Sequence, residues 1–283
     1  MAYVKKPFEE LDVLDNFMFN SLTTDPEIKE KFCRRLIKSL LGKEVGKIKI
    51  EAEKIIMPDN PEKRGVRLDV AILEGKDGER ITNIYDIEPH KDEEKYYAKK
   101  NRYLQAQLDK KAMERGDNDF SHVPDLYIIN ITNYDPFGCN QMVYSIKNTC
   151  EEVPELVYND GVKIYYFNSI GTKGGSQELK IFLKYLVESK NENIVDEATE
   201  EIGSYVNQIK RNSQMEGDYV TVGEWMDKIV DEAVAAVTAD KDAVIANKDI
   251  ELAAKDEKLA NKDAEIAEYK ARIRQLEEDR NKE

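Results

Sequence analysis

The chain of 283 residues has little cysteine and no long apolar run. Its three cysteines, Cys33, Cys139 and Cys150, are scattered and form no CxxC motif, so neither a zinc site nor a disulfide framework is expected. No stretch approaches the roughly 20 apolar residues that a membrane span needs, and the first residues lack the apolar segment of a signal peptide. We therefore expect a protein of a reducing, cytoplasmic setting with no membrane partner.

Acidic residues outnumber basic ones, 57 to 43, which gives a formal net charge of -14. Such a charge argues against a protein that coats nucleic acid without specificity, although a local basic groove is compatible with it. The apolar share of 41% is enough for a hydrophobic core, and the charged share of 35% places much of the chain outside that core. The length suits one domain of good size with appendages, or two domains.

Hydrophobic periodicity predicts an α/β chain that begins and ends with helices. The first 45 residues have helical spacing, with a helix start at Asp25, Pro26 and Glu27 and a stop at Gly42. Strands are predicted at residues 47–56, 66–73, 82–88, 125–132, 142–146 and 162–167. Further helices are predicted at residues 92–115, 177–190, 191–215 and from 221 onward. We divide the chain into a domain at 1–190, a helical region at 191–238 and a repeat region at 239–283.

The repeat region has no glycine or proline and follows a seven-residue period. The residues that mark this period are all apolar: Ile245, Leu252, Leu259, Ile266 and Ile273. The second seam position of the heptad is poor, because Lys248, Lys255 and Lys262 occupy it. We expect one continuous helix from about residue 240. It is either a coiled coil that joins copies of the chain or a single solvated helix with charge pairs four residues apart.

The third predicted strand ends in an acidic stretch, within the segment NIYDIEPH at residues 83–90. Side chains two apart in a strand point to one face, so Glu88 and His90 project together. Asp69 lies in the apolar stretch LDVAI of the preceding strand, where a buried carboxylate needs a partner or a metal ion. If these two strands are antiparallel neighbours, Asp69 faces Glu88. The alternative is a solvated acidic turn that leads into the next helix.

Two carboxylates held side by side repel each other unless a cation lies between them. Mg²⁺ suits such a site, because it binds one or two carboxylates, keeps several waters and takes phosphate oxygens from a substrate. Asp69 and Glu88 are therefore candidate ligands of Mg²⁺, with Mn²⁺ as a substitute. His90 is a candidate to orient water or to stabilise charge on phosphorus. As carboxylates without a protein partner, the two acids are expected to tolerate Asn or Gln without loss of the fold.

The helix that follows is rich in lysine, arginine and tyrosine within an otherwise acidic chain. Side chains three or four apart share a helix face, which groups Lys95, Lys99 and Arg102. A basic stripe beside a carboxylate pair is the pattern expected for contacts with a DNA backbone. The candidate nucleic-acid ligands are Lys91, Lys95, Lys99, Lys100 and Arg102. The alternative is an exposed helix whose lysines only keep it soluble.

Taken in order, these segments resemble the PD-(D/E)XK nuclease family transposases, also called recombination-promoting nucleases. The likeness covers roughly residues 8–190 and rests on LDVLDNFMFNSL, RLDVAI, YDIEPH, KKNRYLQAQLD, PDLYIINI and IYYFNS. It implies a restriction-endonuclease-like α/β fold, a mixed sheet flanked by helices, to which this chain adds a C-terminal helical extension. It also implies Mg²⁺-dependent cleavage of DNA, with Asp69 and Glu88 as the metal-binding acids.

The chain departs from the family pattern at His90, where the family has Gln and the wider superfamily has Lys. A neutral imidazole can bind metal or carry a proton, but it lacks the permanent charge of lysine. This departure puts the activity itself in question. Glu53, on the strand before Asp69, resembles the further acid that some relatives carry on an earlier element.

The function expected from these features is a metal-dependent DNA endonuclease linked to recombination or mobile elements. The alternative is a nuclease fold that no longer cuts and instead binds DNA or a protein, with the coiled-coil tail assembling oligomers. An unrelated acidic structural protein with such a tail is a third interpretation. The nuclease interpretation requires the strand at 125–132 to be central in the sheet and parallel to the Glu88 strand, across the helix at 92–115.

Overall fold

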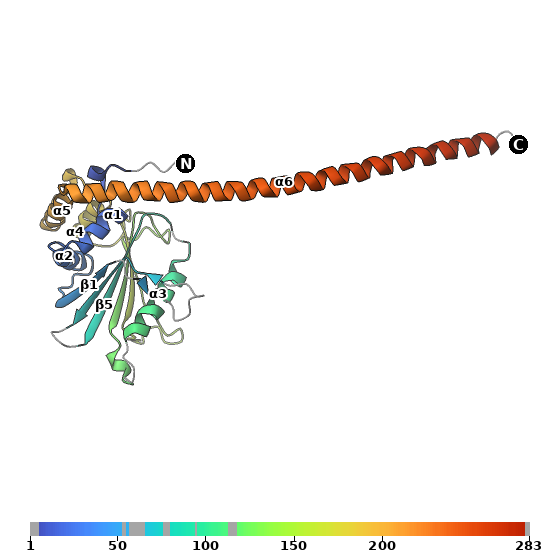
Figure 1. Cartoon of the computed structure of the whole chain (residues 1–283). Helices are drawn as coiled ribbons and strands as arrows, with labels where there is room; N and C mark the ends of the chain where they lie inside the picture. The colour runs from blue at the N-terminus through green and yellow to red at the C-terminus, as the bar shows by residue number, and fades with distance from the viewer. Residues whose placement is uncertain are drawn as a thin grey trace. The chain divides into compact units, whose positions relative to one another are not determined.

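The computed structural model describes residues 6–52, 55–56, 66–75, 80–93, 95–112 and 118–280. The chain divides into two compact units, Met1–Tyr219 and Val220–Glu283. The first unit holds a six-stranded sheet with helices on both faces (Figure 1). A mixed α/β architecture with a C-terminal helix, as the sequence predicts, is therefore present.

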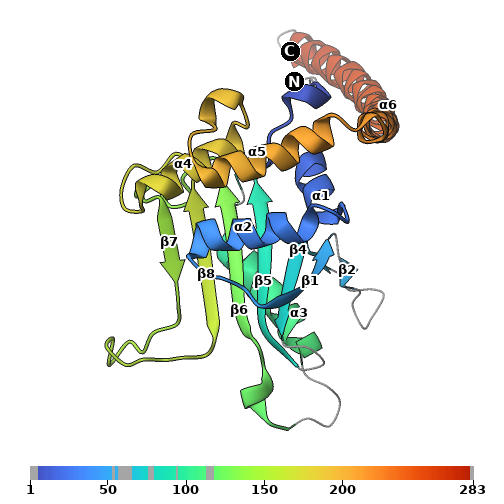
Figure 2. The same cartoon turned by 90° about the vertical axis from the view of Figure 1, so that its left-hand side faces the viewer.

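The six strands form one mixed sheet. They are β1 (Lys47–Ala52), β4 (Val70–Gly75), β5 (Ile81–His90), β6 (Asp125–Thr132), β7 (Val143–Ile146) and β8 (Val162–Asn168). Their order across the sheet is β1-β4-β5-β6-β8-β7 (Figure 2). β1, β4 and β5 form an antiparallel meander, β5, β6 and β8 are parallel, and β7 is antiparallel to β8 at the edge.

The predicted topology at the centre of the sheet is confirmed. β5 lies between β4 and β6, antiparallel to the first and parallel to the second. α3 (Tyr97–Ala112) lies in the connection between β5 and β6, because parallel neighbours need a crossover rather than a tight turn. β6 is buried at every residue but its first. Burial on both faces explains why DLYIINIT is a nearly continuous apolar run.

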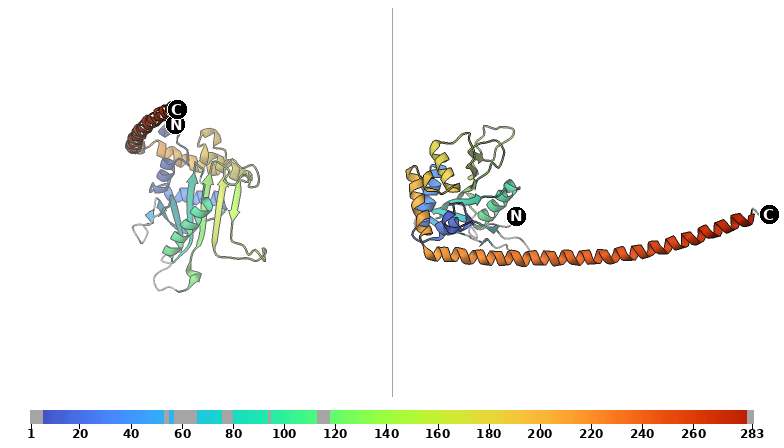
Figure 3. Two further views of the ribbon diagram at one scale, coloured as in Figure 1. Left: turned by 90° about the vertical axis from the view of Figure 1, so that its right-hand side faces the viewer. Right: turned by 90° about the horizontal axis from the view of Figure 1, so that it is seen from above.

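Helices cover both faces of this sheet. α1 (Asn16–Thr24), α2 (Lys29–Leu41), α4 (Gln177–Val187) and α5 (Glu197–Lys210) lie on one face (Figure 2), and α3 lies on the other (Figure 3, left). The described part of this unit also contains three short 3₁₀ turns: η1 (Phe8–Glu10), η2 (Phe120–His122) and η3 (Asn191–Asn193).

The end of helix α2 agrees with the sequence prediction, whereas its start does not. It ends at Gly42, as predicted, and this glycine has a left-handed φ of 66°. It begins at Lys29 rather than at the predicted Pro26. Oδ1 of Asp25 accepts hydrogen bonds from the backbone N–H groups of Glu27 and Ile28. Asp25 therefore caps a turn that precedes the helix. The sequence correctly marks Asp25 as a cap, but the helix itself begins three residues after the predicted Pro26.

Two apolar cores lie on the two faces of the sheet. The larger core contains Tyr85 and Ile87 of β5 together with side chains of α1, α2, α4 and α5. The smaller core lies under α3, where Ile84 of β5 joins Leu104 and Leu108 of the helix. Because side chains alternate along a strand, the even-numbered residues of β5 that follow Ile84 also point towards α3.

Two of the predicted strands are interrupted. The run at 47–56 ends as β1 at Ala52, and β2 (Ile55–Ile56) pairs with β3 (Val66–Arg67) in a separate two-stranded sheet. The run at 66–73 breaks at Asp69, and β4 begins at Val70. In the register that pairs Val70 with Ile87, the break places Asp69 level with the next residue of β5, Glu88. The backbone N–H of Asp69 therefore lies outside the strand ladder and donates to Glu88 instead.

The second unit consists of most of α6 (Ser213–Arg280), a single helix that contains the repeat region (Figure 1). The prediction of one continuous helix from about residue 240 is confirmed, and the helix begins earlier than predicted. The residues that mark the heptad are 49% to 59% exposed: Ile245, Leu252, Leu259, Ile266 and Ile273. Among the described residues, no helix combines the length and apolarity needed to cross a membrane.

Candidate active site

The last residues of β5 carry two buried acids on the face beneath α3. Asp86 is fully buried and Glu88 is 2% exposed. The register places Asp86 between Ala71 of β4 and Ile128 of β6. Both of these neighbours belong to the apolar core under α3. Acids are seldom buried without a partner or a function, so this end of β5 is the candidate active site.

Glu88 is held by contacts from two different elements. Its Oε2 accepts a hydrogen bond from Lys100 Nζ at 2.8 Å, and its Oε1 accepts one from the backbone N–H of Asp69 at 3.3 Å. Lys100 belongs to the first turn of α3, and its side chain is 35% exposed. The predicted closeness of Asp69 and Glu88 is present. The expectation that Glu88 lacks a protein partner is wrong, because α3 brings a lysine to it.

Asp86 lacks such partners. Neither of its carboxylate oxygens has a hydrogen-bond partner within the part of the chain that the structure describes. Burial raises the pKa of Asp86 well above its ordinary value, the negative charges of Glu88 and Asp69 raise it further, and Lys100 opposes them. Glu88, Asp69 and Lys100 therefore all act on the charge of Asp86.

His90 ends β5 and faces α3, as Glu88 does. Its Nε2 lies 3.1 Å from Oδ1 of Asn130 on β6, and its ring meets that of Tyr97 edge-on, with centroids 5.1 Å apart. Asn130 Nδ2 donates to the carbonyl oxygen of Tyr165 at 3.2 Å, which turns Oδ1 of the amide towards the imidazole. The imidazole of His90 is therefore held between the amide of Asn130 and the ring of Tyr97.

Further buried polar groups lie where α3 meets the sheet. Asn101 is fully buried and donates from Nδ2 to the hydroxyl of Tyr166 at 2.8 Å. Burial, with a smaller effect of Tyr134, raises the pKa of Tyr166 to about 12. The Oδ1 of Asn101 and the hydroxyl of Tyr97 have no hydrogen-bond partner among the described residues. Buried polar atoms without partners are rare in folded proteins and are typical of functional sites.

Two of the predicted nucleic-acid ligands pair with acids of the chain. Lys91 Nζ contacts Oδ1 of Asp15, the residue just before α1, and Lys100 contacts Glu88. Burial alone would raise the pKa of Asp15, but hydrogen bonds from Lys91 and from the backbone of Asp12 bring it below its ordinary value. The N-terminal segment is therefore tied to the end of β5. A role of either lysine in holding DNA stays a prediction.

The other three predicted ligands, Lys95, Lys99 and Arg102, are exposed. Helix α3 begins at Tyr97 rather than at the predicted residue 92, so Lys95 precedes the helix in a turn. Their role in binding DNA also stays a prediction. Glu53, the candidate further acid, lies outside the described residues.

The donor set suits an ion that needs few protein ligands. Among the described residues, no group of three or more histidine, cysteine, aspartate or glutamate side chains is arranged to hold a metal ion. Mg²⁺ is commonly bound through only one or two carboxylates plus waters. Both carboxylate oxygens of Asp86 lack a hydrogen-bond partner among the described residues, and Lys100 only partly offsets the negative charge around them. Asp69 and Glu88 could therefore hold Mg²⁺, and a cation there would also relieve the repulsion on Asp86.

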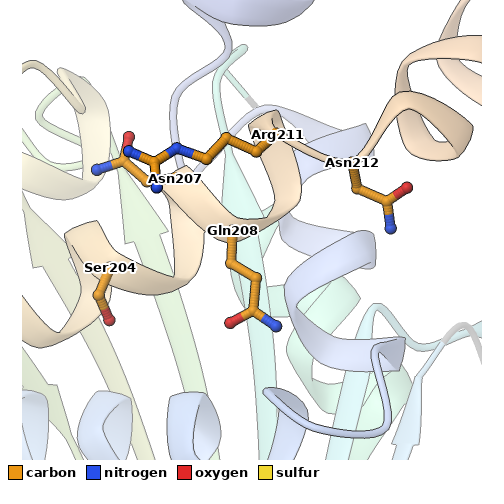
Figure 4. Close-up of a pocket in the computed structure, with 5 residues that line it drawn as sticks. All are labelled: Ser204, Asn207, Gln208, Arg211 and Asn212. Carbon is orange, nitrogen blue, oxygen red and sulfur yellow. The ribbon is translucent and has the colours of Figure 1, made fainter.

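An open hollow of about 620 Å³ lies elsewhere in the first unit, on α5 and the residues that follow it. Its lining consists of Ser204, Asn207, Gln208, Arg211 and Asn212 (Figure 4). In Figure 4 the five side chains project from α5 and from the residues just after it. The lining includes no acid or histidine and shares no residue with the cluster around Glu88. It offers no group for acid–base chemistry, so we place the candidate site at β5.

Sequence reasoning identified Asp69, Glu88 and His90 but missed two neighbours. Asp86 has the same two-residue spacing from Glu88 as His90 has, and this spacing alone predicts that it shares their face. Asn130 is the amide within the apolar run of β6, where an amide signals a buried polar contact. Both signals were present in the sequence.

Comparisons with protein-family models, with curated proteins and with solved structures found no match. The resemblance to PD-(D/E)XK nucleases therefore stays a hypothesis that rests on the motifs. The function has to be argued from the geometry of the cluster around Glu88.

Proposed function

We propose that this protein is a Mg²⁺-dependent DNA endonuclease whose active site is the cluster around Glu88. The observation that carries the proposal is the burial of Asp86 and Glu88 beneath α3, close to Asp69, whose charge raises the pKa of Asp86. The antiparallel meander followed by a helical crossover to a parallel strand is the arrangement that the nuclease interpretation requires. The link to recombination or mobile elements rests on the sequence resemblance alone.

Asp69 and Glu88 would hold the metal ion. When bound, Mg²⁺ supplies a Lewis acid for the phosphodiester and lowers the pKa of a bound water. Lys100 keeps its ammonium group beside Glu88, where it is placed to stabilise the negative charge that builds on the phosphate in the transition state. It thus brings from α3 the permanent positive charge that His90 cannot supply from β5.

His90 would position or accept a proton. Its contact with Asn130 holds the imidazole in place, and the ring is further restrained by Tyr97. A histidine held in one orientation is suited to orient a water molecule or to take up its proton.

Cleavage of supercoiled plasmid tests the proposed function. The full-length chain is incubated with plasmid in Mg²⁺, in Mn²⁺ and in EDTA, and the nicked and linear forms are resolved on a gel. Nicking with either ion and none in EDTA supports the proposal. Absence of cleavage with both ions, on plasmid and on linear and single-stranded DNA, contradicts it.

A fold that binds DNA or protein without cutting is the second candidate. The observation that favours it is the ion pair between Lys100 and Glu88, because a lysine can stabilise a buried carboxylate in place of a metal ion. The half-exposed apolar stripe of α6 adds a face on which a second copy could assemble. DNA retention in a gel-shift experiment, combined with no cleavage in either metal, would favour this candidate.

A further inference from the structure

Exposed tyrosines and basic residues share the outer surface of the N-terminal half of α3. Tyr96, the residue before the helix, is 56% exposed, and Tyr103 is 41% exposed. Between and beside them, Lys95, Lys99 and Arg102 are also exposed. Asp109 is the only acid within Tyr97–Ala112 and lies further along the helix. In a chain with a net charge of -14, this surface combines aromatic rings with positive charge.

The ring of Tyr96 has two ammonium groups close to it. Lys95 Nζ lies 5.4 Å from the ring centroid and Lys99 Nζ lies 5.7 Å from it. Cation–π contacts at exposed sites are weak, so an incoming ligand can displace them. A base that stacks on this ring brings its own phosphates to the two lysines. The same three residues thus offer both contacts that a nucleotide needs.

We propose that this surface, Lys95, Tyr96, Lys99, Arg102 and Tyr103, binds single-stranded DNA and selects an unpaired strand for the site at Glu88. The inference rests on the proposed function only in taking DNA as the ligand. A tyrosine ring can stack on the face of a base only where that base is unpaired and unstacked, whereas in a duplex interior both faces are covered by neighbouring bases. Aromatic rings among basic residues are the arrangement that single-stranded DNA-binding proteins use.

The surface lies next to the candidate active site along the helix. Tyr97 and Lys100 follow Tyr96 and Lys99 directly, and they contact His90 and Glu88 respectively. The spacing of seven residues between Tyr96 and Tyr103 corresponds to a rise of about 10 Å along a helix. Two stacked bases on these rings would therefore bracket the turn of α3 that carries Lys100, the residue that contacts Glu88.

Fluorescence anisotropy in EDTA tests this binding without any dependence on cleavage. The probes are a labelled mixed-sequence 20-nucleotide DNA strand and the same strand in a blunt duplex. We expect the full-length chain to bind the single strand at least about tenfold more tightly than the duplex. Tyr96→Ala and Tyr103→Ala should each weaken single-strand binding about 5- to 150-fold, as loss of one stacked base does. Tyr96→Phe keeps the ring and should keep the affinity.

Tyr158→Ala is the matched control, because Tyr158 is 58% exposed and lies outside α3. It should leave the affinity unchanged, and thermal melting should show that all variants fold. Equal affinity for both probes, no binding to either, or full affinity in Tyr96→Ala overturns the inference. A chain that prefers single strands through Tyr96 but never cuts DNA sustains this inference and removes the proposed cleavage, so the two failures are distinguishable.

Discussion

Lys100 of α3 donates a hydrogen bond to Glu88 of β5 across 2.8 Å, and the carboxylate it reaches is 2% exposed. This contact joins the helix that carries the basic residues to the strand that carries the acids. It also means that the charge of Glu88 is compensated within the chain. The two candidate functions assign this ion pair opposite roles, as a source of catalytic charge or as a substitute for the metal.

Lys100→Met separates these roles. The substitution takes a charged hydrogen-bond donor away from a buried carboxylate. The free energy of unfolding, measured by urea denaturation, should therefore fall by about 1–3 kcal/mol. If Lys100 stabilises the transition state, Mg²⁺-dependent nicking should fall about 100-fold or more. Lys110→Met is the matched control, since it removes an exposed lysine of the same helix that is not among the predicted DNA ligands. Faster nicking in Lys100→Met would show that the lysine blocks the site.

His90 should respond differently to two substitutions. His90→Gln restores the residue of the family pattern and can still hydrogen-bond to Asn130, so cleavage should be kept or raised. His90→Ala removes both the contact with Asn130 and the packing against Tyr97, and cleavage should fall about 10- to 100-fold. The initial rate of plasmid nicking measures both. Equal rates in His90→Ala and the parent would exclude His90 from the chemistry.

Asp86→Val should make the protein more stable and less active. Valine suits a buried strand position between Ala71 and Ile128, and it removes a buried carboxyl group whose oxygens have no partner among the described residues. The free energy of unfolding at pH 7 should rise by about 1–3 kcal/mol, while nicking falls because the acid cluster loses a member. Asp125→Val, at the exposed first residue of β6, should change neither. A lower free energy of unfolding in Asp86→Val would mean that the Asp86 carboxyl group makes favourable contacts in the folded chain.

The apolar stripe of α6 predicts self-association. Leu259→Asp with Ile266→Asp places two charges on the residues that would meet in a coiled coil, so the mass in solution should drop, as measured by light scattering at several concentrations. Asn247→Asp with Asn261→Asp adds the same charge two positions away from the stripe and should leave the mass unchanged. An identical mass for the parent and the stripe variant would leave only a single solvated helix.

The order of the central strands could be predicted because two constraints act together. The acidic end of β5 and the apolar run of β6 are separated by a helical pattern, and such a separation between strands of one sheet favours a parallel pair. The break at Asp69 could not be predicted, because LDVAI reads as an unbroken strand by periodicity alone. It coincides with the pairing of β2 and β3 outside the main sheet, a tertiary contact that periodicity does not show.

The pairing of Lys100 with Glu88 shows a second limit. The spacing of the lysines on α3 predicts which of them share a helix face, but not which face lies on the sheet. That orientation is set by Leu104 and Leu108, which pack into the small core and place Lys100, one turn before Leu104, towards β5. The sequence therefore predicted a basic helix near the acids without predicting which lysine would contact them.

The central claim, that Glu88 belongs to a metal-dependent nuclease site, is tested most directly by the nicking rate of Glu88→Gln in Mg²⁺. Because Glu88 pairs with Lys100, circular dichroism must first show that the variant is folded. Glu93→Gln, an exposed neighbour, controls for the lost charge and should nick like the parent. The account predicts that Glu88→Gln nicks supercoiled plasmid at least about 100-fold more slowly than the parent. A folded Glu88→Gln that nicks as fast as the parent would contradict it.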